Sequence, residues 1–335
     1  MGVKLKGAVI GLGNIATRGH LPAYKDDSIL RESVEIVATM DVVEQNGAVA
    51  QTHLLGARFY TDIETLLEHE QLDFVDVCTP PHTHADYIKR CATKGIHILC
   101  EKPLTEHLDS AMEVVKALEG MNVVFVPCHQ YKYSPLWESV HDVITSGELG
   151  RVTFGQFNVF RLQADTGTES WNPKWRTDRT KSGGGILVDT GAHYFYLAQY
   201  LFGLPANSTS FLRTLKHSDY GVEDTAIVIL DYHDKLIEIN LTWAASRRAN
   251  SIMIAGTEGS LSYDGTKLYK TRGDKMTEIP MPNISDKNQY VSWYASLFKE
   301  FFKRIDENNY SRDLLDEAMN VMKLLEASYH PALHA

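Results

Sequence analysis

The chain has 335 residues, which fits two domains better than one and allows a substantial buried core. Its composition is that of an ordinary globular protein, and its net charge of -10 argues against nucleic acid as a partner, because contacts to phosphate groups require an excess of lysine and arginine. No apolar run approaches the roughly 20 residues of a membrane-spanning helix, so we expect no membrane association.

The N-terminus and the cysteines favour a cytoplasmic protein. The chain passes from Met1 into the strand-like segment 8–10 without the apolar region or cleavage site of a signal peptide. The cysteines at positions 78, 91, 100 and 128 include no C-x-x-C pair and lie in or beside predicted strands and helices. We interpret them as reduced structural thiols, which fits the cytosol.

A glycine-rich turn follows the first predicted strand. Segment 6–10 leads into a G-x-G-x-x-A motif with Gly11 and Gly13, and a helix-compatible stretch follows. Glycines at these positions let the backbone turn tightly and approach a pyrophosphate. Asn14 and Ile15 open the helix, whose N-terminal amide groups and dipole favour phosphate. The turn therefore predicts a dinucleotide site.

The second apolar run, residues 34–40, ends in Asp41. An acidic residue at this place accepts hydrogen bonds from the ribose hydroxyls of an adenosine. Its spacing from the glycines exceeds the usual ~20 residues, and we assign the extra length to a polar loop at 25–28. Asp41 is followed by Val42 and Val43, with no Arg or Ser to hold a 2′-phosphate. This favours NAD over NADP, with NADP as the alternative.

Helices and strands then alternate. Helices are predicted at 49–55, 63–68 and 84–93, and strands at 57–60, 74–78 and 96–100. This alternation predicts an α/β Rossmann fold, a doubly wound parallel sheet. The carboxyl ends of its strands meet at one edge, which brings Thr79, Pro80 and Lys102 to the edge that carries Gly11 and Asp41. We expect the nicotinamide half of the dinucleotide there.

Glu101, Lys102 and Pro103 end the strand at 96–100 abruptly. Open α/β sheets bind their ligands at the carboxyl ends of strands, where Lys102 lies. Taken alone, a solvated lysine in a turn is the alternative. We expect Glu101 to hold the cofactor or the turn rather than to transfer protons.

His82 and His84 invite a metal interpretation. The neighbouring prolines indicate a loop that opens a helix, where residues two apart do not face together. No carboxylate or cysteine cluster completes a ligand set, so we expect no metal. His84 is instead expected to cap or line the helix entry near the cofactor.

The chain is expected to divide near Pro127, after a helix at 105–118 and a strand at 122–126. This gives an NAD(P)-binding Rossmann domain at 1–127 and an α+β domain for substrate binding and oligomerisation at 128–335. The second domain is predicted to hold a large, mostly antiparallel, open-faced sheet from runs at 151–162, 209–215, 225–232, 236–242, 251–255, 259–263 and 268–270. Amphipathic helices at 293–302 and 314–325 are expected to close the chain.

Segment 163–181 is polar, aromatic and irregular, and long loops of this kind are usually functional. Tryptophan faces suit sugar rings and arginine suits anionic groups. We expect this loop to cover the substrate, with Arg161, Trp175 and Arg176 near it.

A run of glycines at 183–185 precedes Asp189 and His193. Their spacing of four places both on one face if residues 189–201 form a helix. For Asp189 a plain N-cap role is as well supported as a catalytic one. For His193 the alternative is a helix residue packed under Tyr194 and Tyr196.

Four motifs in this order resemble the Gfo/Idh/MocA oxidoreductases, the family of glucose–fructose oxidoreductase and inositol dehydrogenase. They are G-L-G-N-I-A at 11–16, T-P-P at 79–81, E-K-P at 101–103, and the glycine run followed by D-x-x-x-H at 189–193. The resemblance covers the first domain and continues to at least Gly259.

The resemblance implies roles for the motif residues. Lys102 would contact the substrate alcohol beside the nicotinamide, often before a cis proline bond. His193 matches the proton acceptor and Asp189 the residue that supports it. A base with a pKa near neutrality suits removal of a hydroxyl proton, and a lysine ammonium stabilises the developing alkoxide. Relatives often carry Asn or Arg where this chain has Gln130 and Lys132, so Gln130 facing the substrate and a polar hinge stay equally open.

The expected function is an NAD(P)-dependent dehydrogenase or reductase acting on a secondary alcohol or ketone of a sugar, cyclitol or nucleotide sugar. An NAD-retaining glycosidase of the same fold and a non-catalytic dinucleotide-binding sensor are the alternatives. Because relatives pack the open sheet face against a second subunit, we expect a homodimer or homotetramer.

Overall fold

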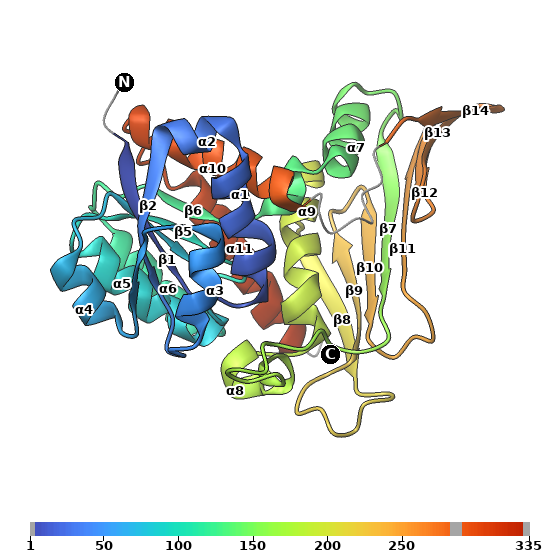
Figure 1. Cartoon of the computed structure of the whole chain (residues 1–335). Coiled ribbons are helices and arrows are strands. Elements are labelled where there is room, and N and C mark those ends of the chain that lie inside the picture. Colours follow the sequence, from blue (N-terminus) through green and yellow to red (C-terminus); the bar gives the residue numbers. More distant parts are fainter. Residues whose placement is uncertain (1–3, 282–289, 331–335) are drawn as a thin grey trace. The chain divides into compact units, whose positions relative to one another are not determined.

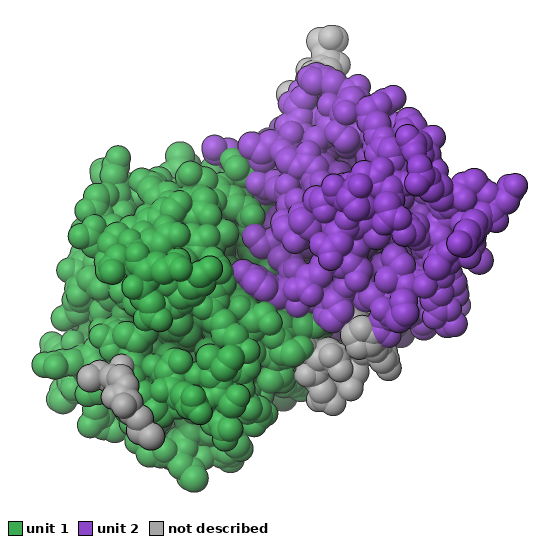
Figure 2. Space-filling view, turned by 90° about the horizontal axis from the view of Figure 1, so that it is seen from above, with its two compact units in different colours: residues 1–130, 166–175, 288–322 green, residues 131–165, 176–287, 323–335 purple. Residues whose placement is uncertain are grey.

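A computed structural model describes residues 4–281 and 290–330. The chain forms two compact units (Figure 2), and each is described by itself. The first unit contains residues 1–130, 166–175 and 288–322, and the second contains residues 131–165, 176–287 and 323–335. The contiguous domains expected at 1–127 and 128–335 stay a prediction, since segments 166–175 and 288–322 belong by compactness with the first unit.

The first unit is built on a six-stranded parallel sheet with the order β3-β2-β1-β4-β5-β6 (Figure 1). The strand order reverses between β1 and β4, which is the point where open α/β sheets bind their ligands. The predicted doubly wound sheet is confirmed. Its strands are β1 (Leu5–Ile10), β2 (Val34–Met40), β3 (Arg58–Tyr60), β4 (Phe74–Val77), β5 (His97–Cys100) and β6 (Phe125–Pro127).

Helices connect these strands, as the alternation predicts. They are η1 (Ala16–His20), α1 (Leu21–Asp26), α2 (Ser28–Ser33), α3 (Asn46–His53), α4 (Ile63–His69), η2 (Pro81–Thr83), α5 (His84–Ala92) and α6 (Leu108–Leu118). The polar loop expected at 25–28 is wrong. The side chain of Asp27 accepts hydrogen bonds from the amides of Ile29 and Leu30 and so starts α2 immediately after α1.

The C-terminal helix α10 (Tyr290–Asp306) also belongs to the first unit. Its Phe298 ring stacks on Tyr24 at a centroid distance of 4.7 Å. Phe301 and Phe302 meet the edge of Phe74 at 5.9 Å and 4.9 Å. These buried aromatic contacts close the core around β4. The last helix, α11 (Asp313–Tyr329), contributes to both units.

The second unit contains an eight-stranded sheet with the order β14-β13-β12-β11-β7-β10-β9-β8. Within the described residues its strand pairs are antiparallel except for β7 with β10, which confirms the mostly antiparallel prediction. The strands are β7 (Val152–Phe160), β8 (Asn207–Arg213), β9 (Thr225–Asp231), β10 (Leu236–Thr242), β11 (Ala249–Gly256), β12 (Ser260–Tyr263), β13 (Leu268–Arg272) and β14 (Lys275–Ile279).

One face of this sheet is covered and the other is open. The helices η3 (Gln130–Tyr133), α7 (Pro135–Thr145), η4 (Trp175–Thr177), α8 (Arg179–Ser182), η5 (Leu187–Gly191) and α9 (Ala192–Phe202) accompany the strands. Trp137 of α7 and Tyr194 of α9 pack on the buried ring of Phe157, at 5.4 Å and 5.7 Å. The neighbours of Phe157 along β7 point away from it, and Phe154 and Phe160 are exposed.

Among the described residues, no helix is both long enough and apolar enough to cross a membrane.

Candidate active site

The glycine turn after β1 has the shape that a dinucleotide requires. Gly11 has φ of 93°, and a Cβ there would lie 2.7 Å from the Thr79 side chain. A Cβ on Gly13 would meet no atom within 4 Å, so this glycine borders open space. Because a side chain would fill that space, the turn fits the close approach of a pyrophosphate.

Asp41 follows β2 and ties the two loops of the dinucleotide site together. Its Oδ2 accepts a hydrogen bond from the Leu12 amide at 2.7 Å, and its Oδ1 accepts one from the Val43 amide at 2.9 Å. The carboxylate is therefore buried and held beside the glycine turn. The expected ribose-binding acid thus also orders the turn that would hold the phosphates.

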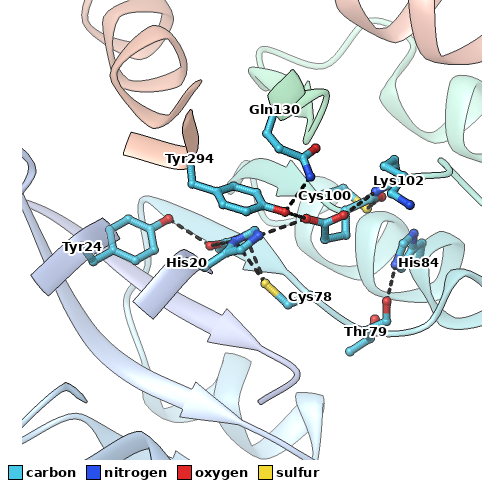
Figure 3. Close-up of polar contacts among 11 residues, drawn as sticks. His20, Tyr24, Cys78, Thr79, His84, Cys100, Lys102, Gln130 and Tyr294 are labelled. Atoms are coloured by element: carbon cyan, nitrogen blue, oxygen red, sulfur yellow. Dashed lines mark hydrogen bonds and ion pairs between the residues drawn. The ribbon is translucent and has the colours of Figure 1, made fainter. Parts of the chain in front are cut away.

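His84 connects the loops that follow β4 and β5. Its Nε2 lies 2.7 Å from the carbonyl oxygen of Thr79, and its Nδ1 lies 3.1 Å and 3.2 Å from those of Pro103 and Leu104. The ring is fully buried, and burial lowers its pKa. His84 starts α5 as expected, and its ring fixes the loops that carry Thr79 and Lys102 (Figure 3).

The turn after β5 is held by the carboxylate of Glu101. The backbone amide of Lys102 donates to Glu101 Oε2 at 3.0 Å, and the hydroxyl of Tyr294 donates to Oε1 at 2.6 Å. The peptide bond between Lys102 and Pro103 is cis. Glu101 is buried whereas Lys102 is partly exposed. Glu101 therefore holds the turn, one of the two roles expected for it.

Three residues around Glu101 were not expected in the site: His20, Asp76 and Tyr294. His20 Nε2 lies 3.0 Å from Glu101 Oε1, and its Nδ1 lies 2.8 Å from Asp76 Oδ2. A sequence signal exists for Asp76, because a charged residue inside an otherwise apolar parallel strand needs a buried partner. Tyr294 lies 193 positions after Glu101, and no local pattern relates the two.

Gln130 is buried in the first unit. Its Nε2 donates to the hydroxyl of Tyr294 at 3.0 Å (Figure 3). In the second unit, the ammonium of Lys132 lies 5.7 Å from the ring centre of Tyr200. The structure therefore gives both residues protein partners near the boundary at 130/131.

In the glycine run of the second unit, neighbouring atoms leave no room for a side chain. A Cβ on Gly184 would lie 2.0 Å from the Tyr329 hydroxyl, and one on Gly185 would lie 1.9 Å from the carbonyl oxygen of Glu223. The Glu223 carboxylate accepts hydrogen bonds from the amides of Gly185 and Leu187, each at 3.0 Å. Burial raises the pKa of Glu223. These contacts anchor the start of the helix pair η5 and α9.

This helix pair carries Asp189 and His193. The hydroxyl of Tyr196 lies 2.8 Å from Nδ1 of His193, and the ring of Tyr131 stacks on the imidazole at 4.1 Å. The Tyr131 amide donates to the same Tyr196 hydroxyl at 3.2 Å. The Tyr196 hydroxyl and the Tyr131 ring thus fix the position and the plane of the imidazole. From the sequence, Tyr196 was expected only as a packing neighbour of His193, and Tyr131 was not expected there.

Asp189 and Arg176 are brought together as an ion pair. The Arg176 Nε donates to Asp189 Oδ1 at 3.0 Å, and the Thr190 hydroxyl donates to Oδ2 at 3.4 Å. Arg161 follows β7, where its Nη1 donates to Asn250 Oδ1 at 2.8 Å. Trp175 falls in the segment 166–175 of the first unit. The residues expected near the substrate therefore divide between the units.

Family models match both parts of the chain. Residues 5–129 match the model described as an oxidoreductase family with an NAD-binding Rossmann fold, and residues 137–262 match the model of the GFO/IDH/MocA C-terminal domain. The glycine turn, Asp41 and the Lys102 turn lie in the first match. Asp189 and His193 lie in the second.

Relatives with named activities are similar over most of their length. D-glucoside 3-dehydrogenase of Escherichia coli is 24% identical over 86% of this chain and 85% of its own. D-apiose dehydrogenase of Paraburkholderia graminis is 28% identical over 77% of this chain and 67% of its own. An Agrobacterium radiobacter oxidoreductase solved with NAD+, L-tartaric acid and magnesium has a TM-score of 0.84 at 20% identity, covering 99% of this chain and 97% of its own, which shows the shared fold.

Proposed function

Because the chain belongs to the Gfo/Idh/MocA family of NAD-binding oxidoreductases, we propose that it transfers a hydride between nicotinamide and a secondary alcohol or ketone of a sugar, cyclitol or nucleotide sugar. NAD, when bound, supplies the hydride acceptor or donor. The named relatives that act on D-glucosides and D-apiose support the carbohydrate class. The remaining chemistry belongs to side chains of this protein.

The observation that carries this proposal is the anchoring of Lys102. Its ammonium is on a partly exposed side chain at the carboxyl end of β5, while its backbone amide is fixed by the buried Glu101. An ammonium held in place stabilises the negative charge that develops on a hydroxyl oxygen as its proton leaves. We assign that role to Lys102.

His193 is the proposed proton acceptor. In the tautomer whose Nδ1 donates to the Tyr196 hydroxyl oxygen, Nε2 is a proton acceptor, and stacking on Tyr131 fixes the plane in which it lies. Asp189 supports this part of the helix through its ion pair with Arg176. We propose that Arg176 and Trp175 border the substrate, and that Gln130 acts through Tyr294.

The test is a screen of the purified protein against polyols, aldoses, inositols and nucleotide sugars, with NAD and NADP in parallel. We expect stoichiometric NADH formation with one class. With that substrate, Lys102→Met and His193→Asn should each lower kcat about a hundredfold or more, because each removes an acid–base or charge-stabilising group. Folded variants that keep full turnover would exclude these roles.

The screen also separates the two alternative functions. A glycosidase that oxidises and re-reduces its substrate around retained NAD would release a free sugar from a glycoside without net NADH. A dinucleotide-binding sensor would bind NAD and turn over nothing. The acid–base set of Lys102, Asp189 and His193 favours the dehydrogenase, since a sensor needs the glycine turn alone.

We further propose that the open sheet face packs against a second copy, giving a homodimer or homotetramer. Phe154, Phe160, Ile227 and Met253 of that face are between 37% and 41% exposed. Phe154→Lys should dissociate the assembly in size-exclusion chromatography with light scattering. Leu55→Lys, at a 93% exposed position outside the sheets, is the control that should leave it intact.

A cytoplasmic location is proposed as well. Cys78, Cys91, Cys100 and Cys128 are all free and buried, which fits a reducing compartment. A fusion to a redox-sensitive fluorescent protein, read in the native host, reports the compartment directly.

A further inference from the structure

We propose that His20 and Tyr294 are positioning residues for Lys102, which they hold indirectly by fixing the Glu101 carboxylate from two sides. The inference rests on the proposed role of Lys102 in the reaction. It assigns to two residues outside the recognised motifs the task of shaping the turn that presents the reacting ammonium.

The two carboxylate oxygens of Glu101 contact Lys102, Tyr294 and His20. Oε2 accepts the backbone amide of Lys102 at 3.0 Å. Oε1 accepts the hydroxyl of Tyr294 at 2.6 Å and lies 3.0 Å from Nε2 of His20. Any rotation of the carboxylate would therefore break the contact to the Lys102 amide together with one of the other two (Figure 3).

The Tyr294 hydroxyl has a defined direction. Gln130 Nε2 donates to its oxygen at 3.0 Å, so the single hydroxyl proton is directed to Glu101. The hydrogen bond of a hydroxyl to a buried carboxylate is short and strong because the acceptor is charged. Tyr294 thus acts as an oriented donor that reaches the turn from α10.

His20 is fixed at its other nitrogen. Its Nδ1 lies 2.8 Å from Asp76 Oδ2 in the middle of β4, and all three groups are buried. A histidine with a carboxylate at each nitrogen donates from both and carries a positive charge. Burial alone would raise the pKa of Glu101, but the hydrogen bond from His20 and the positive charges of His20 and Lys102 lower it.

A packing role alone does not account for this arrangement. Burying three charged groups costs desolvation that apolar residues of the same size would avoid. The buried charges lie beside the turn of Lys102. Every contact of the Glu101 carboxylate described above either holds that turn or orients the carboxylate. Tyr24 provides a comparison inside the same core, because its hydroxyl donates at 3.1 Å to Asp76 rather than to Glu101.

The test compares Tyr294→Phe with Tyr24→Phe in the full-length protein. Each variant removes one buried hydroxyl that donates to a carboxylate, so their effects on unfolding free energy should be similar. The readout is hydrogen exchange of the Lys102 amide by fragmentation mass spectrometry, which is well defined because Pro103 carries no amide hydrogen. We expect exchange about fivefold faster or more in Tyr294→Phe and unchanged in Tyr24→Phe.

With a substrate from the screen, Tyr294→Phe should also lower kcat about tenfold with little change in the KM for NAD, in keeping with one lost charge-assisted hydrogen bond. Equal exchange rates in the two variants would overturn the inference. If Tyr294→Phe does not fold, Gln130→Met removes the donor to the same hydroxyl and is compared with Tyr24→Phe instead. Turnover by Lys102→Met would refute the proposed function, whereas the exchange result stands without any substrate.

Discussion

The hydroxyl of Tyr196 lies 2.8 Å from Nδ1 of His193, one helical turn along α9. In the proposed reaction Nδ1 donates to this hydroxyl oxygen, which makes Nε2 the nitrogen that accepts the proton. Neighbours that occupy the second nitrogen of a working histidine orient the ring and select its tautomer. In this chain that neighbour is a tyrosine, itself held by the amide of Tyr131.

Tyr196→Phe should therefore weaken catalysis without unfolding the protein. The loss of one buried hydrogen bond corresponds to about 1 kcal/mol, and we expect kcat to fall about fivefold to tenfold. The KM for NAD should stay unchanged, since the residues proposed to bind the cofactor belong to the first unit. Steady-state kinetics and thermal unfolding of both proteins check this. A kcat equal to that of the wild type would show that Tyr196 does not orient His193.

Substitution by alanine should weaken NAD binding at Gly13 and lower the stability of the fold at Gly185. A Cβ at Gly13 meets no atom within 4 Å, so Gly13→Ala should change stability by about 0.5 kcal/mol or less. It should weaken NAD binding at least about tenfold, because the methyl group occupies the space for the pyrophosphate. Gly185→Ala, whose Cβ would lie 1.9 Å from the carbonyl oxygen of Glu223, should destabilise the fold by about 1–3 kcal/mol.

Denaturant unfolding and calorimetric titration with NAD separate these effects. Normal NAD affinity in Gly13→Ala would show that the phosphates of NAD do not bind at this turn. Normal stability in Gly185→Ala would show that the Glu223 loop yields easily.

The preference for NAD should depend on Asp41 and its exposed neighbour Val42, which is 62% exposed. Asp41→Ser combined with Val42→Arg removes the carboxylate that repels a 2′-phosphate and adds a cation that binds it. The ratio of kcat/KM for NADP over NAD should rise about a hundredfold or more, the size expected for a gained charge-assisted contact plus a removed repulsion. Val42→Arg alone is the control and should shift the ratio less. An unchanged ratio in the double variant would place the ribose elsewhere.

The stability of the first unit should depend on pH through His20. Burial alone would lower the pKa of His20, but the carboxylates of Asp76 and Glu101 raise it from 6.5 to about 9. A raised pKa in the folded state stabilises the protein fully below pH 6.5, and this contribution is lost as the pH rises towards 9. The shift corresponds to about 3 kcal/mol.

Urea unfolding at pH 6.5, 7.5 and 9 measures this loss. His20→Gln keeps a side chain that can donate to a carboxylate but does not titrate as histidine does. Its unfolding free energy should fall less over this range than that of the wild type. The titratable groups near His20 include Asp76, Glu101, Cys78, Cys128 and Tyr294, and none of them is changed in the variant. Parallel curves for the two proteins would assign the loss to other groups.

Local pattern was sufficient for the parallel, doubly wound sheet and for the residues that end its strands. Apolar runs punctuated by glycine and proline predict the parallel strands, and strand ends predict the edge that holds Gly11, Asp41 and Lys102. The helix α2 was not predicted, although Asp27 is a residue type that commonly caps helices, because the polar segment around it is equally typical of a loop.

The residues that hold the candidate site residues in place could not be predicted from sequence patterns. Tyr294 reaches Glu101 across 193 positions, and Glu223 reaches Gly185 across 38. Such pairs depend on tertiary packing, which produces no periodic pattern in the sequence. The charged residue inside β4 was the one visible sign, since Asp76 could only be buried with a partner.

The course of the chain between its two units has a consequence for biogenesis. The first unit needs α10, which begins only at Tyr290. While a ribosome synthesises the protein, the Phe74 side of the parallel sheet therefore stays uncovered until Phe301 and Phe302 have emerged. Domains that are contiguous in sequence can fold in turn as they leave the ribosome. Here the nascent sheet is exposed to aggregation while more than 150 further residues are synthesised after β6, and a gene truncated after residue 130 would yield an insoluble product instead of a free NAD-binding module.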